Sequence, residues 1–165
     1  MCVWFNNHLV FEWSSVTDFR HLIFFPAGLK LILLMSLGWR AVPGIAVGSA
    51  GHAAADLPDL PMLHLAALCL VYAAAPMAAV SAFGRWAGIV RPWFGLRLVQ
   101  LLCLVVVTAV VTSIAFNTLL IAWGIMESAG CVGSVVAMAG GDVVGAALLL
   151  AVTLMVRRWI SQSPR

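Results

Sequence analysis

The sequence predicts an all-α polytopic membrane protein, a helix bundle with about five transmembrane helices. Hydrophobic residues make up 64% of its 165 positions, charged residues only 9%, and the mean hydropathy is +1.08. A soluble domain has roughly a quarter of its residues charged, so most of this surface must face lipid or other membrane protein. Five segments approach the about 20 apolar residues that a spanning helix needs. In chain order they are residues 21–37, 41–55, 62–83, 98–122 and 132–156.

Two of these segments depart from the ideal length. The second is short, so it is expected to tilt, to thin the bilayer locally or to be shielded by neighbouring helices. The fourth could extend to Met126, which suggests strong tilt or a break near Asn117.

The connections between the segments alternate in charge and so predict an orientation. Acidic connections carry Asp56, Asp59 and Glu127, and only Arg20 adds a basic residue on their side. The basic positions in the other connections and the tail are Arg40, Arg85, Arg91, Arg97, Arg157, Arg158 and Arg165. Under the positive-inside rule the N-terminus lies outside and the C-terminus in the cytoplasm, as in a multi-pass protein of the bacterial inner membrane. A four-span or six-span interpretation would break this alternation.

The chain therefore divides into three predicted parts. Residues 1–20 form an outer-side segment, 21–158 a single transmembrane domain and 159–165 a short cytoplasmic tail. Within the first part, residues 3–13 predict either an interfacial helix or a loop packed on the helix ends. The basic residues are too few and too dispersed for a nucleic-acid partner, so membrane lipids and other proteins are the expected partners. No cofactor is indicated.

Lys30 and Asp142 are the most informative pair in the sequence. Each lies about ten residues inside its span, roughly 15 Å deep at the helical rise, and so near the bilayer midplane. An unpaired charge there is costly, so both side chains should face the bundle interior. They predict either a ligand, ion or proton site, or a structural ion pair for which nearby glycines permit close helix approach.

A second group of candidates lies near the outer ends of the spans. His52 and Asp56 are one turn apart on one helix face, and with Asp59 and His64 they could bind a metal. The alternative is that they are solvated interface residues. The fourth span also carries polar residues, which we expect to form hydrogen bonds between helices; they are Gln100, Thr108, Thr112, Ser113 and Asn117. No residue pattern of an enzyme is present, so no catalytic residue is assigned.

Two blocks of the sequence resemble a known family. The first runs Phe25-Pro26-Ala27-Gly28-Leu29, followed by Leu37-Gly38-Trp39-Arg40-Ala41-Val42-Pro43-Gly44-Ile45-Ala46-Val47-Gly48. The second is Gly141-Asp142-Val143-Val144-Gly145. They are similar to the first membrane-associated sensor (MASE-type) family of bacteria, whose modules precede diguanylate cyclase, histidine kinase and similar output domains. The resemblance implies helix-packing or motif roles for Pro26, Gly28, Pro43, Gly44, Gly48, Gly141 and Gly145.

The resemblance implies a non-enzymatic sensor module. The family domain is usually longer and carries a cytoplasmic output domain, whereas this sequence has none after Arg165. We therefore expect it to act through a separate signalling protein. The alternative is an accessory or assembly subunit of a larger membrane complex, and a small transporter or channel is a third possibility.

Overall fold

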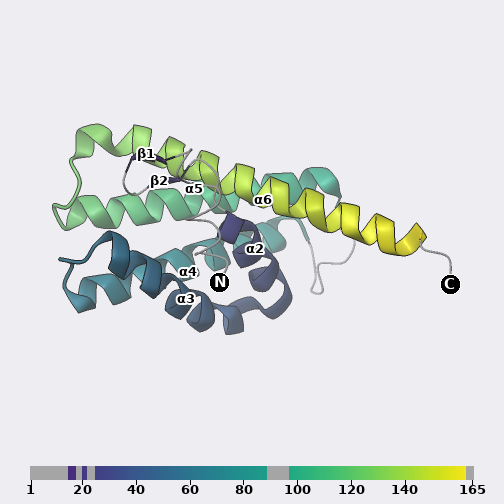
Figure 1. Ribbon diagram of the computed structural model, residues 1–165, viewed down its shortest axis with the longest axis horizontal. Helices are drawn as coiled ribbons and strands as arrows, with labels where there is room; N and C mark the ends of the chain where they lie inside the picture. The colour runs from purple at the N-terminus through teal and green to yellow at the C-terminus, as the bar shows by residue number, and fades with distance from the viewer. Residues whose placement is uncertain (1–14, 18–19, 22–24, 89–96, 163–165) are drawn as a thin grey trace.

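Five α-helices account for most of the chain in the computed structural model, which describes residues 15–17, 20–21, 25–88 and 97–162 (Figure 1). They are α2 (Phe25–Leu37), α3 (Ala41–Asp56), α4 (Met62–Trp86), α5 (Leu98–Ala122) and α6 (Cys131–Gln162). Two 3-10 turns precede α3 and α6, η2 (Gly38–Arg40) and η3 (Ser128–Gly130). A short antiparallel pair, β1 (Ser15–Thr17) and β2 (Arg20–His21), comes before the helices, and β2 contacts α6.

The predicted segments correspond closely to these helices, with two corrections. The first helix begins at Phe25, because His21 belongs to strand β2. Of the two alternatives for the fourth segment, strong tilt or a break near Asn117, the structure excludes the break: α5 is continuous and ends at Ala122, two residues before Gly124 with its φ of +71°. The interfacial helix or loop predicted for residues 3–13 lies outside the described residues.

Four described stretches are long and apolar enough to cross a membrane, where the sequence predicts five. They are Ala27–Gly51, Met62–Trp86, Leu98–Ala122 and Ser128–Thr153. The first combines α2 and α3, because these helices of 13 and 16 residues are each shorter than the about 20 residues of a full crossing. A fifth crossing is therefore not established by helix length.

A turn at η2 separates α2 from α3 and gives them different neighbours. Gly38 has a φ of +63°, a left-handed conformation that ends a helix at little cost for glycine. After this turn α3 packs on α4, whereas α2 packs on α6 (Figure 1). The two short helices therefore behave as separate packing elements.

Two apolar clusters hold the bundle together, and α2 contributes to both. Leu31 packs with residues of α4, α5 and α6, including Leu104 and Ala146. Leu34, fully buried, packs with Ala73 and other residues of α3 and α4. Through these contacts α2, the shortest of the described α-helices, lies between the α3–α4 side and the α5–α6 side of the bundle.

Candidate functional site

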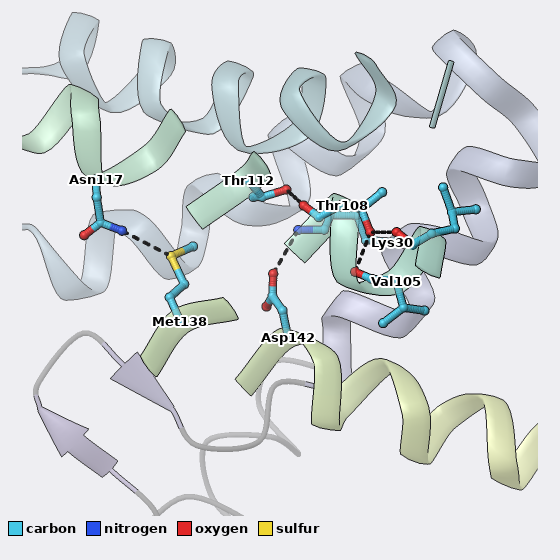
Figure 2. A network of polar contacts seen from close by, with 8 residues as sticks. Lys30, Val105, Thr108, Thr112, Asn117, Met138 and Asp142 are labelled. Atoms are coloured by element: carbon cyan, nitrogen blue, oxygen red, sulfur yellow. Dashed lines mark hydrogen bonds and ion pairs between the residues drawn. The ribbon is translucent and has the colours of Figure 1, made fainter. Parts of the chain in front are cut away.

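Lys30 and Asp142 lie within 3.9 Å of each other, measured from Nζ to Oδ2, inside the bundle (Figure 2). Lys30 comes from α2 and Asp142 from α6, and their exposed fractions are 7% and 5%. The two groups form an ion pair, but their separation is longer than the roughly 2.7–3.2 Å between donor and acceptor in a protein N–H···O hydrogen bond. Among the described residues, Lys30 Nζ has no hydrogen-bond partner.

Tyr72 of α4 completes this cluster, although no sequence motif predicts a role for it. Lys30 Nζ lies 3.8 Å from the centre of the Tyr72 ring, a cation–π contact. The Tyr72 ring in turn makes a T-shaped contact with the Phe116 ring of α5, with ring centres 6.2 Å apart. The only lysine and the only tyrosine of the chain therefore meet where α2, α4, α5 and α6 converge. The presence of only one lysine and one tyrosine was the one available signal for this contact. Residue spacing along the chain does not show which residues of different helices meet.

Gly28 explains how α2 and α6 come close enough for this pair to form. A Cβ atom at Gly28 would lie 2.9 Å from Leu149 Cβ and 3.0 Å from Ala146 Cα, closer than real side chains allow. On the opposite helix, Gly141 and Gly145 are buried on either side of Asp142. The absence of a side chain at Gly28 thus lets the two backbones approach, two residues from Lys30 on α2 and, at Ala146, one turn from Asp142 on α6.

The other motif positions have different surroundings. Gly44 and Gly48 are exposed on α3, and a Cβ at either would meet nothing within 4 Å. Pro43 is exposed as well, and the side chain of Pro26 lies outside the described residues. Gly44 and Gly48 therefore lie on a face of α3 that no other described residue covers.

The polar residues of α5 mostly bond within their own helix, contrary to the expectation of bonds between helices. Thr108 Oγ1 donates to the carbonyls of Leu104 and Val105, and Thr112 Oγ1 donates to that of Thr108 (Figure 2). Gln100 accepts a bond from the Arg97 backbone and caps the helix. In the apolar interior, bonding to a carbonyl one turn back satisfies a hydroxyl without requiring a partner helix.

Asn117 is the α5 residue that does bond across helices. Its Oδ1 accepts a hydrogen bond from Ser134 Oγ of α6, and its Nδ2 contacts Met138 Sδ at 3.9 Å. Nδ2 also donates to the Ser113 carbonyl. Ser113 Oγ itself is fully buried and has no hydrogen-bond partner among the described residues.

The structure does not test the metal site predicted from His52, Asp56 and His64, because it describes only one of the three side chains. The side chains of His52 and Asp56 lie outside the described part of the chain. Within the described part, no group of three or more His, Cys, Asp or Glu residues could hold a metal. His64 packs its ring edge-on against Trp123, with centres 4.6 Å apart, and its buried Nδ1 has no partner among the described residues.

The energy of the cluster of Lys30, Tyr72 and Asp142 depends on how α2, α4 and α6 lie relative to one another. The positive charge of Lys30 and the negative charge of Asp142 cancel, so the site has no net charge. The two side chains come from different helices, α2 and α6. Ion-pair and cation–π energies depend on distance and orientation, so a small shift of α2, α4 or α6 changes them.

Comparison with known proteins supplies one match. The family model MASE1, a membrane-associated sensor domain, matches residues 3–165, nearly the whole chain. No curated protein and no solved structure matches the chain significantly.

Proposed function

Because the chain belongs to the MASE1 family of membrane-associated sensor domains, we propose that it is a non-enzymatic sensor module of the bacterial inner membrane. We place its responding site at the Lys30–Tyr72–Asp142 cluster. The observation that carries this assignment is a buried, net-neutral ion pair that joins two helices and rests on an aromatic ring of a third. Ionisable residues at membrane depth generally mark functional sites because their burial is costly.

Helix α6 is the proposed route from this site to a partner protein. It runs without interruption from Cys131 to Gln162 and carries Asp142. The membrane-length stretch ends at Thr153, and the helix continues beyond it, past the ends of its neighbours (Figure 1). A displacement at Asp142 would therefore reach a separate signalling protein at this end through a rigid element.

We further propose that the chain crosses the membrane five times, with the N-terminus outside and the C-terminus in the cytoplasm. Supporting it, α2 and α3 have different packing partners on either side of the η2 turn. The alternation of basic and acidic connections supports the orientation.

Recovery of a partner protein tests this function. The chain is purified in mild detergent from its native membrane, and co-purifying proteins are quantified by mass spectrometry. The double variant Lys30→Met/Asp142→Leu removes both charges together, and Thr118→Val, which removes an exposed hydroxyl bonded to its own helix, is the matched control. We expect a specific partner whose recovery changes severalfold in the double variant but not in Thr118→Val. A folded double variant with unchanged recovery, or a wild-type chain that purifies alone, contradicts the proposal.

An accessory subunit of a larger membrane complex is the alternative function. The observation in its favour is a set of exposed glycines with nothing within 4 Å of a Cβ: Gly44, Gly48, Gly133 and Gly140. Small residues let membrane helices approach closely, so these faces suit packing by another protein. This function predicts a fixed assembly whose recovery is the same for wild type and double variant, and which is weakened by Gly48→Ile.

A further inference from the structure

We propose that Lys30 and Asp142 hold a hydroxyl group between them, from an uncharged small molecule or from water. This inference rests on the proposed sensor function for its biological meaning, and it specifies the chemical class of the ligand. Its starting point is that two opposite charges lie 3.9 Å apart without a direct hydrogen bond. At a separation above about 3.5 Å, a hydroxyl or water oxygen beside both groups can bridge them with a hydrogen bond to each.

The hydrogen-bonding chemistry of the pair selects the bridging group. A lysine ammonium has three donors and no acceptor, whereas an ionised carboxylate only accepts. A hydroxyl serves both, because its oxygen accepts from Lys30 Nζ and its proton is donated to Asp142. An ether or ketone could satisfy only the lysine.

The charge of the site argues for a neutral ligand. Lys30 and Asp142 already compensate each other within the bundle, and both are more than nine-tenths buried. A bound anion or cation would leave an uncompensated charge at membrane depth, which is unfavourable.

Two further polar atoms lie on α5 and α4, helices that contribute Phe116 and Tyr72 to the aromatic contact beside Lys30. Ser113 Oγ is fully buried and has no hydrogen-bond partner among the described residues, and it lies one turn along α5 from Phe116, which contacts Tyr72. Pro76 lies inside α4, and because proline has no N–H, it cannot donate the usual helical bond to the Tyr72 carbonyl.

Lys30 gives a direct test because it is the only lysine in the chain. The full chain is labelled with [ζ-15N]lysine and placed in phosphatidylcholine nanodiscs, where its side chain gives one NMR resonance. The probes are 1-butanol, its isomer diethyl ether, butanoate and butylammonium. They share a similar size and offer respectively a neutral hydroxyl, a neutral acceptor, an anion and a cation.

We expect a saturable shift of the Lys30 Nζ resonance with 1-butanol, and binding of the other three probes at least about tenfold weaker. Thr118→Val should retain the shift. A cross-peak between the Nζ protons and water, with no shift from 1-butanol, supports the same chemistry with water as its source. An equal response to diethyl ether, a stronger response to either ion, or neither a shift nor a water cross-peak overturns the proposal. Partner recovery is measured without probes, so it separates failure of this ligand from failure of the sensor function.

Discussion

At the scale of single residues, the membrane makes the Lys30–Asp142 pair expensive to disrupt. Placing one charged residue at the centre of a bilayer helix costs about 2.5–3.5 kcal/mol on insertion scales. Each charge of the pair offsets part of that cost for the other, and the Tyr72 ring adds a cation–π contact. Removing one partner should therefore be more harmful than removing both.

We expect Asp142→Asn or Lys30→Met to lower the free energy of unfolding by about 3–5 kcal/mol, since either leaves a buried charge unpaired. The double variant Lys30→Met/Asp142→Leu should recover most of that loss, because no charge remains. Unfolding by sodium dodecyl sulfate, followed by circular dichroism, measures these differences. Losses in the double variant equal to the sum of the single losses would show that the two charges do not interact.

Asn117 and Ser134 form the hydrogen bond that joins α5 to α6. A double-mutant cycle of Asn117→Ala and Ser134→Ala should give a coupling energy of about 0.6–1.7 kcal/mol, as for other hydrogen bonds between membrane helices. Thr118→Val serves as the comparison, because its hydroxyl bonds only to Ile114 of the same helix. Additive effects of Asn117→Ala and Ser134→Ala would indicate that this bond contributes nothing to stability.

At the scale of helices, two glycines of the same motif block have opposite surroundings. Gly28 lies against α6, whereas Gly48 lies on an open face of α3. The family motif predicts the same packing or motif role for both glycines, because it does not specify which helix faces which. Their different contacts can be tested with one matched pair of substitutions.

Gly28→Ala should destabilise the protein by about 1–3 kcal/mol, since the new methyl group overlaps Leu149 and Ala146. Gly48→Ala should change the unfolding free energy by no more than about 1 kcal/mol, because its methyl group meets nothing. The same sodium dodecyl sulfate titration measures both. Similar effects of the two substitutions would contradict the close approach of α2 and α6.

At the scale of the whole molecule, the arrangement of connections predicts which face meets the cytoplasm. In a variant without its native cysteines, we expect Ser128→Cys to react with an impermeant maleimide on intact spheroplasts. Trp86→Cys should react only in inverted vesicles, because it lies on the arginine-bearing side, next to Arg85. The reverse pattern, or labelling of both from one side, would refute the proposed orientation.

The helices themselves were largely predictable from the sequence. In lipid every backbone polar group must be satisfied within the chain, so an apolar stretch of sufficient length forms a helix wherever it lies. The predicted starts of α3, α4 and α5 agree with the structure to the residue. The start of the first helix was wrong, because the pairing of His21 with Ser15 in a strand does not show in local hydropathy. Tilt or a break of α5 was left open, because the bond of Asn117 to Ser134 comes from another helix.

By itself, the sequence determined a helical membrane protein, the approximate bounds of its helices and the two deeply placed charges. The tertiary structure decided that Lys30 lies beside Asp142 and over Tyr72, that Gly28 contacts α6 and that Gly48 does not. The physical reason is that lipid is as apolar as the helices, so hydrophobicity drives helices into the membrane without selecting their partners. Close packing and a few buried polar contacts make that selection, and both depend on residues that are far apart in the chain.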